Sequence, residues 1–349
     1  MKLVSVVILN WNGLGFLEKF LPTLVKYTRH PEAEIVVADN GSVDHSMEFM
    51  EKEFPSIRTL RLEKNHGFSG GYNRALEQIE ARYYLLLNSD IEVTEGWLDP
   101  LLQAMQDHPG VAACTPKILN YQQKSHFEYA GAAGGFIDRF GYPFCRGRIF
   151  DAMEEDRGQY DQSTELFWGT GACLMVRSDL WKEAGGLDEQ FFAHMEEIDL
   201  CWRLKRLGHA ILSVPSSTVF HVGGGTLERG HPMKTFLNFR NNLLLLYKNL
   251  PPEQRAFTIF VRMLFDGISA LRFLLQGAFK DFWAVIRAHR AFYGMKNSYR
   301  GTNTKNKTGK NNVIVSEIYP GSIVADFFLL GKKSFEQLDQ GFRKKQVEQ

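Results

Sequence analysis

Polar side chains follow three apolar stretches near the start of the chain, each at the point where the stretch ends. They are residues 10–12 (Asn-Trp-Asn), 39–44 (Asp-Asn-Gly-Ser-Val-Asp) and 88–90 (Asn-Ser-Asp). Carboxylates and amides can ligate a divalent metal or hydrogen-bond to a nucleoside, and open α/β sheets bind ligands beyond the carboxyl ends of their strands. Such turns connect strands in many proteins, so the hypothesis of a ligand site depends on the three sets together.

Two adjacent glutamates, Glu196 and Glu197, begin a predicted helix over residues 196–207. The residues three, four and seven positions after Glu197 are apolar, so Glu197 continues an apolar stripe and is expected to point into a cleft. Burial raises the pKa of such a carboxyl and the helix N-terminus lowers it, which suits a general base. The alternative is that acids simply favour the first helical turn. Asp199 lies on another side of this helix and can pair with Arg203.

Two further features are candidates for binding an anion or a metal. Residues 65–73 predict a glycine-rich turn before a helix, where backbone N–H groups, among them that of Gly67, can approach an anion, and Asn73 lies at its end. His221 ends a predicted strand directly before three glycines. A lone histidine is more often structural, and the alternative is that His221 ligates a divalent metal.

The elements that must position these residues alternate between strands and helices over the first 115 residues, which predicts βαβ units and a mostly parallel sheet flanked by helices. The polar sets then converge, because parallel strands end at the same edge of a sheet. Residues 116–165 are expected to form loops and mixed strands of a pocket wall. Strands are predicted over residues 3–9, 34–38, 58–62, 83–87, 172–176, 211–214 and 218–222, and helices over 16–25, 46–54 and 72–81.

The C-terminal third is predicted to be helical and amphipathic, over residues 236–250 and 257–293. The division expected is a catalytic domain over 1–228 and a helical region over 229–349, with a basic, mobile loop near 297–312. Charged residues interrupt the apolar segments and argue against a membrane span. They favour peripheral contact with the cytoplasmic face of a membrane, where anionic lipid attracts Lys and Arg. The alternatives are packing on the catalytic domain or on a second subunit of a homo-oligomer.

Composition excludes several classes of protein. The chain has 349 residues, 44% of them hydrophobic and 23% charged, which is ordinary for a globular protein. A formal net charge of +1 gives no argument for nucleic acid as a partner. The four cysteines lack metal-binding spacing, which predicts reduced thiols. The N-terminal apolar stretch is only as long as a strand, which predicts a cytoplasmic protein.

Taken in order, these motifs resemble the family 2 glycosyltransferases, and the similarity covers roughly residues 1–225. The resemblance is greatest to the bacterial enzymes of rhamnosyl and related transfer in surface-polysaccharide synthesis. It implies a GT-A (Rossmann-like) α/β fold and a metal-dependent, inverting transfer of a sugar. The donor implied is a dTDP- or UDP-sugar, dTDP-rhamnose among them, and the acceptor is a hydroxyl of a saccharide or lipid-linked molecule. The similar segments are residues 4–12, 36–42, 65–73, 87–90, 169–172 and 191–203.

The resemblance also implies roles for single residues. Glu197 is expected to be the catalytic base, where the family more often has aspartate, and Asp90 with His221 to bind Mg²⁺ or Mn²⁺. The metal motif is usually Asp-x-Asp, but Asn88 replaces its first acid here, so fewer carboxylates hold the ion. The donor nucleotide is expected to contact Asn10, Asn12, Asp39, Ser42, Gly67, Asn73, Asn88 and Ser89, and the sugar or acceptor Trp168, Gly169, Thr170 and Glu196.

Three other functions remain open at this level. A sugar nucleotidyltransferase would have a basic, glycine-rich phosphate loop after the first strand, but residues 12–16 contain no basic residue. A glycosidase needs only two carboxylates, and the nucleotide-type strand ends argue against it. Asn88 motivates the third alternative, a catalytically impaired carbohydrate-binding or scaffold protein.

Overall fold

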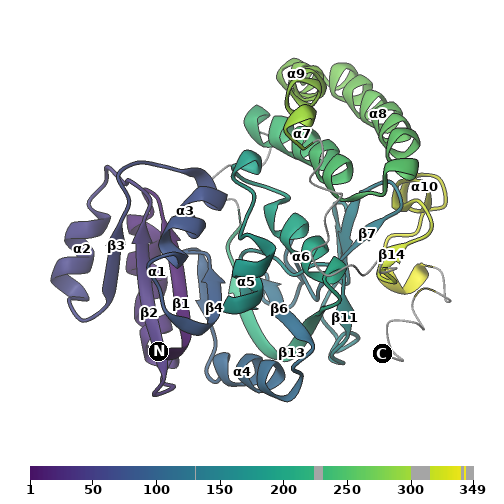
Figure 1. The fold of residues 1–349 in the computed structure, drawn as a ribbon. Coiled ribbons are helices and arrows are strands. Elements are labelled where there is room, and N and C mark those ends of the chain that lie inside the picture. Colours follow the sequence, from purple (N-terminus) through teal and green to yellow (C-terminus); the bar gives the residue numbers. More distant parts are fainter. Residues whose placement is uncertain (130, 224–230, 300–314, 339–341, 343–349) are drawn as a thin grey trace.

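The computed structural model describes residues 1–349 except 130, 224–230, 300–314, 339–341 and 343–349 (Figure 1). The described residues form a nine-stranded sheet in the order β11-β13-β6-β12-β4-β1-β2-β3, with β5 paired to β13. A second, five-stranded sheet has the order β10-β9-β8-β7-β14. The main strands are β1 (Lys2–Asn10), β2 (Ala33–Asp39), β3 (Arg58–Arg61), β4 (Ala81–Leu87), β5 (Ile91–Val93), β6 (Val111–Asn120), β11 (Glu165–Leu166), β12 (Cys173–Arg177) and β13 (Ala210–His221); the smaller sheet has β7 (Gly135–Asp138), β8 (Pro143–Cys145), β9 (Arg148–Ile149), β10 (Ala152–Met153) and β14 (Ile318–Tyr319).

Strand direction brings the polar sets to one edge. The pairs β1–β2, β2–β3 and β1–β4 are parallel. Because β12 is antiparallel to both β4 and β6, and β13 is parallel to β6, the strands β6 and β13 run in the same direction as β4. Strand β1 starts near the N-terminus at the bottom of Figure 1, so the shared carboxyl edge faces the top. The predicted mixed, mostly parallel α/β sheet is confirmed.

The core follows from strands that are apolar on both faces. In β4, Tyr83 and Leu85 pack in one hydrophobic cluster and Tyr84 and Leu86 in the other, because side chains alternate between the faces of a strand. Helices α1 and α4 pack on one face of the sheet, and α3, α5 and α6 on the other. The bounds are α1 (Leu14–Tyr27), α2 (Ser46–Glu53), α3 (Gly67–Leu76), α4 (Leu98–Asp107), α5 (Ser178–Ala184) and α6 (Glu196–Arg206).

Two predicted elements differ from the structure. The helix expected over 72–81 begins at Gly67 and ends at Leu76, so the glycines predicted to form a turn lie inside it. Gly71 belongs there because a Cβ on it would lie 2.8 Å from the side chain of Leu9. The strands expected over 211–214 and 218–222 form one strand, β13, with a register shift between Val214 and Thr218.

The C-terminal third contains α7 (Pro232–Asn249), α8 (Pro252–Leu275), α9 (Phe279–Met295), the short helix α10 (Ile323–Phe328) and the 3₁₀ turn η2 (Lys296–Tyr299). The apolar stretch 257–293 is therefore two helices, which turn at Gly277 with φ of +74°. The predicted boundary at 228 and most of the predicted loop 297–312 lie outside the described residues, so the domain division remains a prediction. In the described part of the chain, no helix is both long and apolar enough to cross a membrane.

Candidate active site

The ends of β1 and β2 are joined by a side-chain hydrogen-bond network. Asn10 lies opposite Asp39 in the sheet, and its Nδ2 donates to Asp39 Oδ1 and to Ser42 Oγ, each at 3.2 Å. Ser42 Oγ also accepts from the backbone N–H of Asn12 at 2.9 Å. The sequence placed these four residues at neighbouring strand ends, and the structure brings them together. Asn10 Oδ1 is buried beside Gly13 and has no hydrogen-bond partner among the described residues.

Asn40 fixes the segment that leads into α3. Its side chain accepts from the backbone N–H of His66 and donates to the carbonyl of Gly67, both at 3.0 Å. The N–H groups of Phe68 and Ser69 donate to the carbonyl of Phe192 at 2.8 and 3.3 Å. The N–H of Gly67, which the sequence placed near an anion, donates to Asn65 Oδ1 at 2.7 Å, so all three N–H groups already have a partner within the protein.

A methyl group at Gly67 is expected to destabilise the protein. Gly67 has φ of +72°, and a Cβ there would lie 2.5 Å from the ring of Phe192. The left-handed backbone costs an L-residue about 1–2 kcal/mol, and the clash adds to it. We expect Gly67→Ala to lower the free energy of unfolding in denaturant by about 3 kcal/mol. Gly96 has φ of +71° with nothing within 4 Å of its Cβ position, so Gly96→Ala should show the backbone cost alone.

Asn73 has a different position from the one expected of a donor-binding residue. Its Nδ2 donates to the carbonyl of Leu187 at 2.8 Å, and its Oδ1 accepts from the N–H of Leu187 at 2.9 Å. This two-way contact ties α3 to the segment that precedes α6. The observed role is to hold that segment in place.

The end of β4 carries a buried carboxylate–imidazole pair. Asp90 Oδ1 lies 3.1 Å from Nε2 of His221, and Glu128 Oε2 lies 3.3 Å from Nδ1 of the same ring. Burial opposes ionisation of both partners, but their mutual attraction prevails: it raises the pKa of His221 to about 10 and lowers the pKa of Asp90. The predicted metal ligands Asp90 and His221 therefore lie together, and Glu128 was missed.

The residues present fit a divalent metal in part. The 3.1 Å contact between Asp90 and His221 is that of an ion pair, so His221 would have to lose its proton before Nε2 could ligate an ion. Among the described residues, no group of three or more His, Cys, Asp or Glu side chains is arranged to hold a metal ion. Diphosphate oxygens would have to complete the coordination. Asn88 donates its N–H to the carbonyl of Ala172 at 2.9 Å, and Ser89 Oγ lies 3.6 Å from the Cβ position of Gly13.

Glu196 and Glu197 begin α6 as predicted, and one carboxylate oxygen of each is buried without a hydrogen-bond partner among the described residues. Burial raises the pKa of Glu197 to about 7, and burial together with the charge of Glu197 raises the pKa of Glu196 further. Burial thus favours the protonated form of both carboxyls, and more strongly that of Glu196. Asp199 pairs with Arg203 at 2.8 Å, which confirms the predicted ion pair.

The turn before α6 has an unusual backbone. Phe192, His194 and Met195 all have positive φ, of 65°, 70° and 74°. The buried amide of Asn241 in α7 donates to the carbonyls of Phe191, Ala193 and His194 at 2.9, 2.8 and 2.7 Å. A residue of the C-terminal helical region thus holds the turn that aims the two glutamates.

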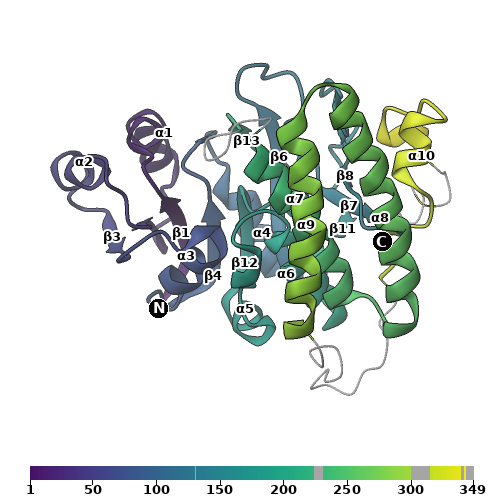
Figure 2. The ribbon, with the colours of Figure 1, turned by 90° about the horizontal axis from the view of Figure 1, so that it is seen from above.

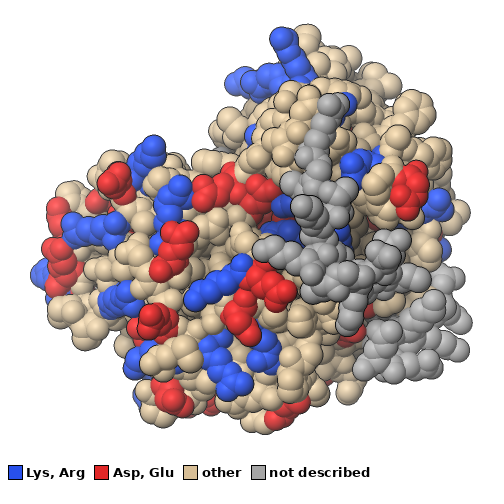
Figure 3. Space-filling model, in the orientation of Figure 1, with Lys and Arg blue, Asp and Glu red and all other residues tan. Residues whose placement is uncertain are grey.

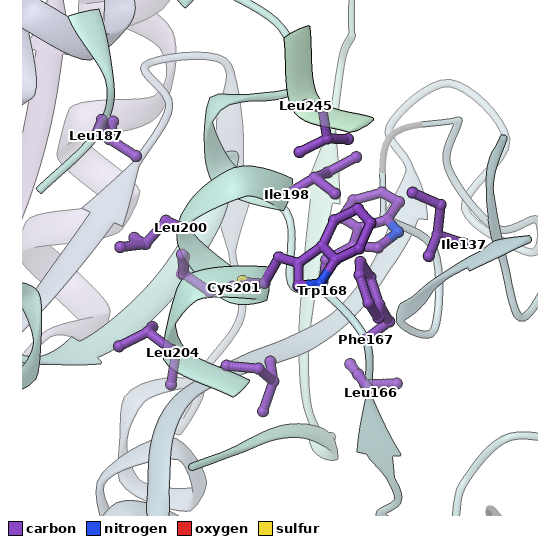
Figure 4. Close-up of a cluster of buried hydrophobic side chains, with 14 of the residues drawn as sticks. Ile137, Leu166, Phe167, Trp168, Leu187, Ile198, Leu200, Cys201, Leu204 and Leu245 are labelled. Atoms are coloured by element: carbon purple, nitrogen blue, oxygen red, sulfur yellow. The ribbon is translucent and has the colours of Figure 1, made fainter. Parts of the chain in front are cut away.

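The predicted sugar-pocket residues before β12 are mostly core. Trp168 is 5% exposed, and its Nε1 donates to the carbonyl of Phe136 at 2.9 Å. Figure 4 shows the ring among apolar side chains that include Ile198 and Cys201. Trp168 therefore presents no open face to a sugar, and the expected role is replaced by packing. Thr170 is also buried, and Gly169 packs against Leu174.

The segment after Thr170 connects the glutamates to the strand ends. Gly171 lies beside Glu197, since a Cβ on the glycine would be 3.7 Å from that of the glutamate. The carbonyl of the next residue, Ala172, accepts a hydrogen bond from the N–H of Asn88, and β12 starts opposite the end of β4. Glu197 and the 88–90 triplet are thus each linked to the segment 171–172, which connects the half-buried Glu197 to the polar edge of the sheet.

This fold is the GT-A fold of glycosyltransferases. A crystal structure of GalNAc-T7 with UDP, GalNAc and Mn²⁺ superposes with a TM-score of 0.55 at 17% identity, and the similar part covers 71% of this chain and 48% of that one. The chain belongs to glycosyl transferase family 2, whose family model matches residues 5–179.

Two relatives come from an actinobacterium and an archaeon. An N-acetylglucosaminyl-diphospho-decaprenol L-rhamnosyltransferase of Mycobacterium tuberculosis is 28% identical over 236 residues, 62% of this chain and 75% of that protein. A low-salt glycan biosynthesis hexosyltransferase of Haloferax volcanii is 26% identical over 220 residues, 61% of this chain and 66% of that protein. The glycosyltransferase class predicted from the sequence is confirmed.

Proposed function

We propose that this chain is an inverting glycosyltransferase that moves a sugar from a dTDP- or UDP-sugar, with dTDP-rhamnose the first candidate, to a hydroxyl of a saccharide or lipid-linked acceptor in cell-surface polysaccharide synthesis. The observation that supports it most is the position of Glu197, a half-buried glutamate with one buried carboxylate oxygen, which is linked through the segment 171–172 to the end of β4. The Mycobacterium relative acts on a diphospho-decaprenol acceptor by name, which supports a lipid-linked acceptor and peripheral contact with the cytoplasmic face of a membrane.

In the proposed mechanism, residues of this chain place the two substrates and move one proton. Asn10, Asp39 and Ser42 orient the nucleoside. Glu197 Oε accepts the proton of the acceptor hydroxyl while that oxygen attacks the anomeric carbon, and the bond from this carbon to the diphosphate breaks, which inverts the configuration. A Mg²⁺ or Mn²⁺ ion held by Asp90 and His221 would neutralise the leaving diphosphate.

A thermal-shift screen of nucleotide sugars with and without Mn²⁺ tests donor and metal together. We expect one dTDP- or UDP-sugar to stabilise the protein only when Mn²⁺ is present, by about 2.7 kcal/mol when the ligand is at a hundred times its Kd. Asp90→Asn should lose most of this stabilisation because it removes a metal ligand. Asp99 is an exposed carboxylate in the first turn of α4, so Asp99→Asn is a matched control that should keep it.

Two outcomes would contradict the proposal. If no nucleotide sugar stabilises or is hydrolysed by the native protein, a carbohydrate-binding or scaffold role replaces the enzymatic one. If stabilisation is equal after chelation of the metal, the ion is not part of the donor site.

A further inference from the structure

A long apolar surface lies on the outer side of α8 and α9. Figure 2 shows these two helices side by side. Large hydrophobic side chains are exposed at spacings of mostly three or four residues along each helix, which places them on one side of it. They are Phe257, Phe260, Leu264, Ile268, Leu271, Leu274, Leu275, Phe279, Trp283, Ile286 and Tyr293. We call this surface the outer face.

The polarity of α8 is the reverse of that of an ordinary surface helix. Its buried side contains an ion pair, Arg262 Nε to Asp266 Oδ1 at 2.7 Å, and His289 of α9 contacts the same carboxylate at 3.1 Å. The side that faces solvent carries Phe260 and Ile268, which are 60% and 65% exposed. An ordinary surface helix buries its apolar residues and exposes its charges. This reversal indicates that the outer face is made to contact something apolar.

The exposed charges along α8 and α9 are mostly basic, and the one exposed acid of these two helices, which are described in full, is Glu253 in the first turn of α8. Between Phe257 and Tyr293, a stretch that the structure describes completely, the exposed charged residues are Arg272, Lys280, Arg287 and Arg290, all basic. The acids of the same stretch are engaged: Asp266 is buried, and Asp281 accepts from the hydroxyl of Thr235 at 2.5 Å. In Figure 3 the top of the molecule is mostly tan, with blue side chains projecting from it.

We propose that the outer face docks the protein on the surface of an anionic lipid bilayer. Apolar and aromatic side chains would enter the boundary between headgroups and acyl chains, and the four basic residues would contact lipid phosphates. A second copy of the chain fits less well. A twofold interface pairs a surface with itself, so this face would bring eight basic side chains together with only the two copies of Glu253 to compensate.

The orientation of the molecule agrees with this docking. The carboxyl edge of the sheet and the helices α7 to α9 both lie toward the top of Figure 1. A membrane against the outer face would therefore lie on the side toward which the strand ends point. This inference rests on the proposed function, in which the acceptor is lipid-linked, and it assigns the surface that brings the site to such an acceptor.

Flotation of the full chain with lipid vesicles tests the docking. We expect about tenfold stronger binding to vesicles of equal parts phosphatidylglycerol and phosphatidylcholine than to phosphatidylcholine alone, with a decrease as salt is raised. Phe260→Glu with Ile268→Glu should weaken binding to the anionic vesicles by about tenfold or more, because each substitution would place a negative charge where an apolar side chain contacts the lipid. Gln78→Glu with Gln106→Glu adds the same charge at exposed positions outside this region and should leave binding within about twofold.

Three results would overturn the docking proposal. The first is that the native protein does not bind anionic vesicles. The second is that the two double variants bind these vesicles equally well. The third is light scattering in which Phe260→Glu with Ile268→Glu turns a native dimer into a monomer while vesicle binding is unchanged, because the face would then join two copies. Stabilisation by nucleotide sugar and Mn²⁺, measured without lipid, should be equal in the native protein and the two double variants. Its absence would count against the proposed function and not against the docking.

Discussion

Replacing Glu197 with glutamine is expected to reduce sugar transfer by about a thousandfold while donor binding is retained. The amide keeps the shape of the side chain but cannot accept the proton of the acceptor hydroxyl, and a general base contributes about 10² to 10⁴ in rate. The measurement is kcat with the acceptor saturating, beside a thermal shift with nucleotide sugar and Mn²⁺. Full activity of the variant would show that Glu197 is not the base.

Glu196→Gln is the matched control for that experiment. Burial and the neighbouring charge raise the pKa of Glu196 well above its usual range, so its protonated form is favoured. An amide resembles a protonated carboxyl in shape and in hydrogen bonding, so the loss of activity should be less than about tenfold. A larger loss in Glu196→Gln than in Glu197→Gln would exchange the two roles.

The pH profile gives an independent check on the base. Burial raises the pKa of Glu197 to about 7, and only its ionised form can accept a proton. The rate should therefore fall as the pH decreases through about 7, and the residual activity of Glu197→Gln should lack this acid limb.

The sheet could be predicted from sequence because its central strands are continuous apolar runs. Such runs occur in strands covered on both faces, and a polar residue directly after one marks the carboxyl edge. This logic placed Asn10, Asp39 and Asp90 at one edge. It failed for α3, because glycines suggest turns, whereas Gly71 is there to let the helix approach Leu9 closely.

The parts of the site that could not be predicted depend on contacts between distant segments. Glu128 reaches His221 from an irregular region with no periodic pattern. Trp168, which the resemblance assigned to the sugar or acceptor, is buried. One missed residue did leave a signal. Asn241 and Asn242 come directly before four leucines of α7, and amides next to such an apolar run need buried hydrogen-bond partners.

Replacing Asn241 with leucine is expected to lower kcat by about ten- to a hundredfold with little change in the KM for the donor. The amide donates to three carbonyls of the turn at Phe191–His194, where residues in the left-handed region cost about 1–2 kcal/mol each. Without these bonds the turn can relax and shift Glu197, and a displacement near 1 Å can reduce the rate by about a hundredfold. Stability should fall by about 2–4 kcal/mol, because buried acceptors lose their donor.

Asn242→Leu separates this positioning role from a general loss of stability. Asn242 is equally buried and adjacent in α7, but its amide contacts the carbonyl of Gly141 and the guanidinium of Arg262, not the turn. We expect a similar decrease in the free energy of unfolding and a change in kcat of less than about threefold. The two variants are compared by kinetics at a temperature where both are folded. Equal loss of kcat in both variants would mean that Asn241 contributes to the fold without positioning Glu197. A loss of kcat confined to Asn241→Leu, with the acid limb of the pH profile displaced from about 7, would show that α7 holds the catalytic turn.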